Sequence, residues 1–174
     1  VHVEGKAMSD RQTLSVAGMF ADRDARRRRE REAEEQLRRK QDEELAAFKK
    51  RLDEFQLTQH GIDLAMEKIR RAFDRGETEL MFASFPSSFC TDDGRSVLNA
   101  GAPPIVKPDK NAPKPEVPDW INTMAKGARV VYDYWKANME PGGFKLSARV
   151  INFPDGKPGD VGLFFSWPKD LSGE

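Results

Sequence analysis

The sequence predicts an α+β protein, in which a long charged N-terminal helix precedes a small domain with a three-stranded, mainly antiparallel sheet covered by helices. The first observation is a stretch from residue 21 to about 73 that has no proline and one glycine, Gly61, and consists mainly of helix formers. The second is an apolar pattern of helical period over residues 119–143. The third is strand-like alternation in three short runs, at 78–85, 144–153 and 160–167.

Composition limits the classes of protein that fit. The 174 residues are 33% charged and 38% hydrophobic, and the formal net charge is +0, so no global field attracts nucleic acid or anionic lipid. Cys90 is the sole cysteine, which excludes an internal disulfide. No apolar run approaches the roughly 20 residues of a membrane span, and no secretory signal is evident. We therefore expect no membrane partner, and a cytoplasmic location or a place inside an assembly made there.

The chain divides into three predicted segments. Residues 1–20 lack periodicity and are expected to be mobile. Residues 21–61 form the long charged helix, which becomes coiled-coil-like from Leu45, and residues 62–170 form the small domain with a proline-rich loop at 86–118. Gly61 could end the helix, with Asp63 capping a second one, or could be tolerated inside it. Because the apolar register continues past Gly61, we favour a continuous or kinked helix to about residue 73.

The first half of this helix has no apolar stripe and is expected to be held by charge pairs. Each pair of opposite charges four residues apart contributes about 0.2–0.5 kcal/mol on an exposed helix. The six pairs are Arg26 with Glu30, Arg28 with Glu32, Arg31 with Glu35, Glu34 with Arg38, Arg39 with Glu43, and Lys40 with Glu44.

An a/d seam follows in the second half. Its first four members, which we assign to oligomerisation or docking, are Leu45, Phe48, Leu52 and Phe55; the next four, which we expect the small domain to cover, are Ile62, Met66, Ile69 and Phe73. The first four need another surface, either a copy of this chain or another protein, unless the helix folds back on its own domain. We expect serine at Leu52 and Phe55 to dissociate the assembly and leave the domain folded.

The elements of the small domain follow in order. The strand at 78–85 directs Leu80 and Phe82 to one face and Met81 and Ala83 to the other, and Asp119 caps the helix that runs to Gly143. The buried stripe of that helix is Ile121, Met124, Ala128, Val131 and Trp135. The inward residues of the last two strands are Phe144, Leu146, Ala148 and Val150, then Val161, Leu163, Phe165 and Trp167.

Few residues offer a chemistry. Arg26, Arg27, Arg28 and Arg29 are a possible phosphate contact, but the charge of +4 over residues 23–31 is followed by −2 over 32–56, which favours a solvated helix. Cys90 has only His2 and His60 as possible bases, so a structural thiol, no metal site and no cofactor are expected. Three aromatic residues off the inward stripes are candidates for an exposed contact surface: Tyr132, Tyr134 and Phe164.

A pattern in the C-terminal part resembles short phage-encoded proteins with a helix leaving through G-x-[ST], a G-[YF]-x-[VL] strand and a last strand ending in S-W. The matching positions are Gly76 with Thr78, Gly143 with Phe144 and Leu146, and Ser166 with Trp167. The resemblance spans about residues 62–167, interrupted by the proline-rich loop, and it implies a virion or phage-assembly setting with no catalytic residue.

These observations together indicate a non-enzymatic structural or assembly protein that oligomerises or docks through the helical seam. The alternative is a nucleic-acid-associated regulator that uses the arginines of residues 23–31, and an enzyme with an unrecognised pocket is a third, less favoured, class.

Overall fold

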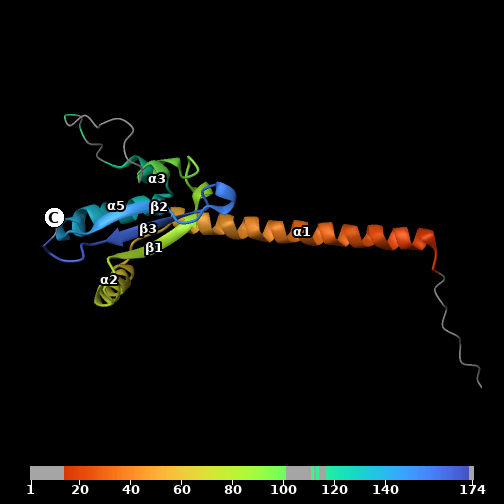
Figure 1. The fold of residues 1–174 in the computed structure, drawn as a ribbon, viewed down its shortest axis with the longest axis horizontal. Coiled ribbons are helices and arrows are strands. Elements are labelled where there is room, and N and C mark those ends of the chain that lie inside the picture. Colours follow the sequence, from red (N-terminus) through yellow and green to blue (C-terminus); the bar gives the residue numbers. More distant parts are fainter. Residues whose placement is uncertain (1–13, 101–110, 112, 114–116, 173–174) are drawn as a thin grey trace, which may run out of the picture. The chain divides into compact units, whose positions relative to one another are not determined.

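The computed structural model describes residues 14–100, 111, 113 and 117–172, and it has the α+β architecture that the sequence predicts (Figure 1). The helices are α1 (Val16–Asp53), α2 (Gln59–Asp74), α3 (Arg95–Ala100), α4 (Asp119–Asn122) and α5 (Lys126–Asn138). The strands are β1 (Glu79–Pro86), β2 (Lys145–Val150) and β3 (Asp160–Ser166), and single 3-10 turns lie at Ser87–Phe89, Glu140–Gly142 and Pro154–Gly156.

The long helix begins earlier than predicted. Ser15 stands just before α1, and its Oγ accepts a hydrogen bond of 3.0 Å from the backbone N–H of Gly18. A serine hydroxyl in this position satisfies a backbone donor of the first turn, so the helix begins at Val16. The predicted helix start at residue 21 is therefore wrong, because residues 16–20 already belong to the helix, and residues 1–13 lie outside the described residues.

The helix also ends earlier than predicted. α1 stops at Asp53 and α2 starts at Gln59, so the preference for a continuous helix through Gly61 is wrong. Thr58 adopts an extended backbone conformation, and its Oγ1 accepts a hydrogen bond of 3.1 Å from the Gly61 N–H. Thr58, rather than Asp63, caps the second helix, and Gly61 lies inside its first turn.

The chain forms two compact units, residues 1–46 and residues 47–174. Within the described residues of the first unit, every residue is exposed except Ala25, which is half-buried. The second unit contains the last turns of α1 and all the remaining elements.

The sheet has the strand order β1-β3-β2 and is antiparallel throughout. Phe165 on β3 stands between Leu80 and Leu146, and Val161 stands between Phe85 and Val150. The inward faces predicted for β2 and β3 are confirmed, because both sets pack in the core.

The alternation predicted for β1 is wrong at its middle. A bulge between Met81 and Ala83 leaves Phe82 outside the register and pairs Ala83 with Leu163 on the inward face. A bulge of one residue reverses the face of every later side chain on its strand, which is why Ala83 points with Leu80 rather than with Met81.

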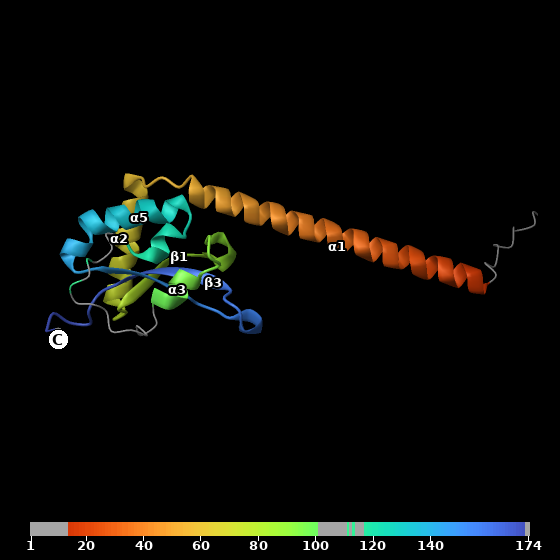
Figure 2. The same cartoon turned by 90° about the horizontal axis from the view of Figure 1, so that it is seen from above.

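The core lies on one face of the sheet, where α2 and α5 pack (Figure 2). One cluster is built on Ile69, Met139 and Phe165, and a larger one includes Val97, Trp120, Ile121, Val161 and Leu163. Phe82, Trp135 and Leu146 contact both clusters, so the two form one continuous apolar layer.

Two segments of the second unit differ from their predictions. The predicted loop 86–118 contains a 3-10 turn and α3, whose start is held by Asp92: its Oδ2 accepts from the Ser96 N–H at 2.8 Å. Most of residues 101–116 lie outside the described part of the chain.

The single helix predicted over 119–143 is split, and the Thr123 hydroxyl donates to the Trp120 carbonyl at 2.8 Å where α4 ends. Asp119 is the first residue of α4 rather than its cap.

A glycine in α5 permits close approach to the end of α1, and this gives a test of the fold. A Cβ at Gly127 would overlap the carbonyl oxygen of Leu52 and lie 2.8 Å from the Phe55 Cβ. We expect Gly127→Ala to lower the free energy of unfolding by about 1–3 kcal/mol, measured by urea denaturation. Gly142→Ala is the control, because a Cβ there meets its nearest atom at 3.8 Å. Equal stability of the two variants would contradict the contact.

Candidate docking site on the helices

The last turns of α1 pack on the core of the second unit. The rings of Phe48 and Phe89 meet edge to face with centroids 5.6 Å apart, and Leu52 packs against the same cluster. Asp53 follows, and its Oδ1 accepts a hydrogen bond of 3.2 Å from the N–H of Lys126, the first residue of α5. A carboxylate at the N-terminus of a helix is favoured by the helix dipole, so this end of α1 is fixed by both apolar packing and charge.

The four predicted docking residues are therefore in two different environments. Phe48 and Leu52 are half-buried against their own domain, whereas Leu45 and Phe55 are 44% and 41% exposed. A Leu52 substitution would therefore remove a side chain that packs on the core, so it is expected to lower the stability of the domain as well as any docking. Only Leu45 and Phe55 stay available to another surface.

An apolar groove lies beside Phe55. It has a volume of about 320 Å³ and is lined by the 55–58 linker, α2, β1 and α5. Two of its residues, Leu64 and Met81, are 45% and 46% exposed. The sequence analysis missed them because Leu64 lies off the apolar stripe of α2 and Met81 lies on the outer face of β1.

A second apolar pocket, of about 410 Å³, lies between the end of α2 and the C-terminal segment. Its lining includes Phe73, Phe144, Trp167 and Leu171. The small domain was expected to cover Phe73, but this side chain is 60% exposed. The helix positions it on the rim of the pocket, whereas Ile69, one turn earlier, is buried.

The arginine cluster is solvated. Arg26, Arg27, Arg28 and Arg29 are all exposed, and the only hydrogen bond that their side chains make to the described residues is that from the Arg29 Nε to the Ala25 carbonyl, at 3.4 Å. None of the six charge pairs predicted for α1 forms in the described part of the chain. The ion pair at this spacing that does involve a residue of α1 joins Lys50 to Glu54, just beyond the helix end, with 3.9 Å between Nζ and Oε1. Ordering two long exposed side chains offsets most of their attraction in water.

The predicted aromatic contact surface is mostly absent. Tyr132 and Phe164 are each 5% exposed, and only Tyr134, on the rim of the apolar groove, is half-exposed. Phe164 lies on the outer sheet face, where the guanidinium of Arg149 stacks 3.6 Å from the ring centroid.

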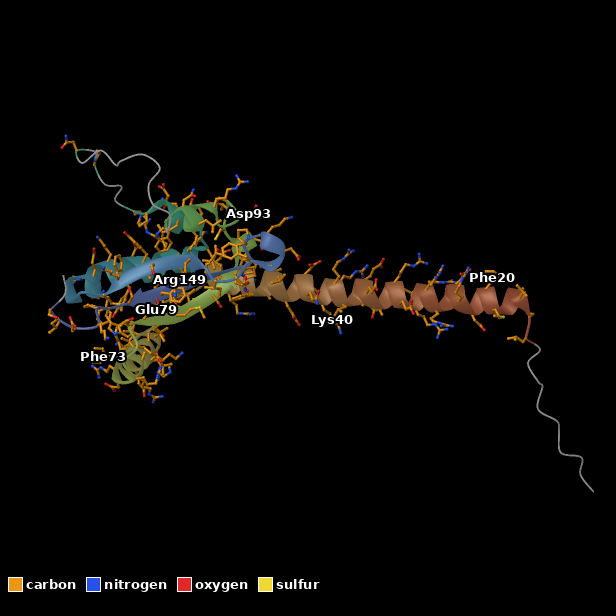
Figure 3. The ribbon with its side chains drawn as sticks, in the orientation of Figure 1. Phe20, Lys40, Phe73, Glu79, Asp93 and Arg149 are labelled. Atoms are coloured by element: carbon orange, nitrogen blue, oxygen red, sulfur yellow. The ribbon has the colours of Figure 1, made fainter. Side chains whose placement is uncertain are left out.

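An ion pair across the sheet holds Arg149 over Phe164. Its Nη1 donates to Glu79 Oε2 at 2.9 Å, and the two residues lie together on this face (Figure 3). The hydrogen bonds from Arg149 hold the pKa of the Glu79 carboxyl below its usual range. An apolar ring on the outer face of a strand is thus covered by a planar cation that the sequence pattern did not predict.

The described residues show little that could carry a reaction. Cys90 is buried, and its burial raises the pKa of its thiol to about 11, with a smaller contribution from the nearby charge of Asp92. No group of three or more His, Cys, Asp or Glu side chains in the described part is placed to hold a metal ion.

Among the helices described, none combines the length and the apolar character that crossing a membrane requires.

Comparisons of the chain with protein-family models, with curated proteins and with solved structures found no match.

The thiol of Cys90 gives a pH-dependent contribution to stability with a definite sign. Its pKa is raised from 9.0 to about 11 by folding, so its contribution is complete below pH 9 and is lost as the pH rises through about 11. We expect the free energy of unfolding, followed by urea denaturation across this range, to fall more steeply in the wild type than in Cys90→Ala. Parallel curves for the two proteins would show that the thiol is ordinary.

Proposed function

We propose that this chain is a non-enzymatic structural or assembly protein, in which a small α+β domain carries a long helix that docks on another protein chain. The observation that supports the proposal is α1 itself. None of its 38 residues is buried, although a helix of a globular protein ordinarily buries one face. Apolar residues such as Phe20, Leu37 and Leu45 are exposed along it.

The docking residues that the proposal assigns are Leu45 and Phe55, the two of the original four that do not pack on the core. Phe55 also lies next to the apolar groove, so a partner that covers it would bury Leu64 and Met81 as well. Removing apolar surface from water stabilises a complex by roughly 25 cal/mol for each Å², so burial of these side chains by a partner would favour the complex.

The proposal is tested by sedimentation velocity at tens of micromolar. We expect a mean mass above the 19.7 kDa of one chain, and a dissociation constant at least about tenfold higher for Leu45→Ser combined with Phe55→Ser. Leu98→Ser is the control, because Leu98 is 39% exposed but belongs to α3 and does not line the apolar groove. If the double variant associates as the wild type does, the assignment of these two residues is wrong. A monomeric wild type would mean that the partner is a different protein.

The second candidate is a nucleic-acid-associated regulator, and the exposure of the unpaired Arg26 to Arg29 cluster favours it. Under the assembly proposal we expect only weak binding to a DNA or RNA duplex, unchanged when these four arginines become glutamine. Fluorescence anisotropy across a salt series measures this. Tight binding that falls steeply with salt and is lost in the variant would instead support the regulator.

The resemblance to short phage-encoded proteins adds a virion or phage-assembly setting to the proposal, with the cytoplasm as the other location. It rests on the turn and strand-end residues named above and carries no residue role.

A further inference from the structure

The first unit carries a regular face that becomes evident once α1 is seen to begin at Val16. Alternating steps of four and three residues from Val16 define what we call the heptad face. Its members are Val16, Phe20, Arg23, Arg27, Glu30, Glu34, Leu37 and Gln41. Residues at this spacing lie on one side of a helix. All eight are exposed, and Phe20 projects from α1 without a covering element (Figure 3).

The heptad face is complementary to itself when it is reversed. Counting inward from its two ends, the positions match as Val16 with Gln41, Phe20 with Leu37, Arg23 with Glu34, and Arg27 with Glu30. In heptad notation the d positions are Val16, Arg23, Glu30 and Leu37, and the a positions are Phe20, Arg27, Glu34 and Gln41. Each match therefore joins an a position to a d position, as in the layers between antiparallel helices. A twofold axis between residues 28 and 29 would generate every layer twice.

We propose that a second copy of this chain pairs with the first along the heptad face in antiparallel orientation. The inference rests on the proposed function, since it names the docked partner as another copy. Four Arg–Glu pairs would form the centre of the contact, with a Phe20–Leu37 layer on each side. In a parallel, in-register pair Arg23 would face Arg23 and Glu30 would face Glu30, so repulsion disfavours that orientation.

The neighbouring positions agree with this arrangement. Asp24 and Arg31 occupy e positions, which face each other between antiparallel helices, and their charges are opposite. In the single chain Arg23 lies 3.1 Å from Asp24 and its guanidinium lies 4.6 Å from the centroid of Phe20. In the pair, Arg23 would give up this contact with Asp24 and contact Glu34 of the second copy instead. The long arginine side chains would still keep their charged ends near water. Charged layers fix register at the expense of affinity, so the pair should be weak and sensitive to salt.

Charge reversal tests the pairing. One variant combines Arg23→Glu with Arg27→Glu, and the other combines Glu30→Arg with Glu34→Arg. Each alone places like charges in four layers, so we expect its dissociation constant to rise on the order of tenfold or more. Mixed in equal amounts, the two variants have complementary layers throughout and should associate as the wild type does. Sedimentation velocity at low and high salt measures all three.

A matched control makes the same changes outside the heptad face. Arg28→Glu with Arg29→Glu, and Glu32→Arg with Glu35→Arg, alter the same number and kind of charges at outward positions. These variants should associate as the wild type does. A loss equal to that of the heptad-face variants would mean that only net charge matters, and it would overturn the proposal.

Orientation is measured by spin labels in a Cys90→Ala background, with cysteine placed at Ala25 or Ala46. From the rise of about 1.5 Å per residue, an antiparallel pair offsets the two Ala25 labels by about 10 Å along the axis and the two Ala46 labels by about 52 Å. Equal distances at the two sites would indicate parallel helices and overturn the proposal, as would a wild type that is monomeric throughout.

If association is lost in Leu45→Ser with Phe55→Ser but survives charge reversal, the proposed function stands and this pairing fails. If association instead survives Leu45→Ser with Phe55→Ser but is lost on charge reversal, the antiparallel pairing stands and the assignment of Leu45 and Phe55 as docking residues is wrong.

Discussion

The contact between the end of α1 and α5 is the constraint that decides where the long helix ends. Phe48 and Leu52 complete the apolar cluster at Phe89, and Asp53 holds the first N–H of α5. The contact is possible because Gly127 has no side chain where the Leu52 carbonyl lies. A helix that could have continued to residue 73 therefore ends where its last apolar turns meet the domain, and the chain turns through the 54–58 linker into α2.

Much of this fold could be predicted because it depends on local patterns. The inward residues of β2 and β3 follow from alternation, and the helical character of residues 21–53 follows from composition. The errors arise where a single side chain decides a boundary. Ser15 and Thr58 cap helices that have no apolar signal at that point, and Thr123 closes α4 inside a stripe that reads as one helix.

The candidate site was harder to predict because it depends on contacts between distant elements. The spacing of Leu45, Phe48, Leu52 and Phe55 indicates a common face, but whether that face meets its own domain or another chain depends on α5 and Phe89. Phe164 shows the same limit: its position on the outer face predicts exposure, yet Arg149, which is held in place by Glu79, covers its ring. A pattern in one segment identifies the surface but not its occupant.

The sheet itself is poorly suited to recruiting a further strand. The order β1-β3-β2 leaves β1 and β2 as the outer strands, and these expose backbone donors and acceptors. On β1, the bulge at Phe82 interrupts the regular spacing of those groups, and Pro86 at its end has no N–H to donate. On β2, the strand is only six residues long and α3 packs against it. Fibrous growth by edge-to-edge addition of strands is thereby discouraged at both edges of this sheet.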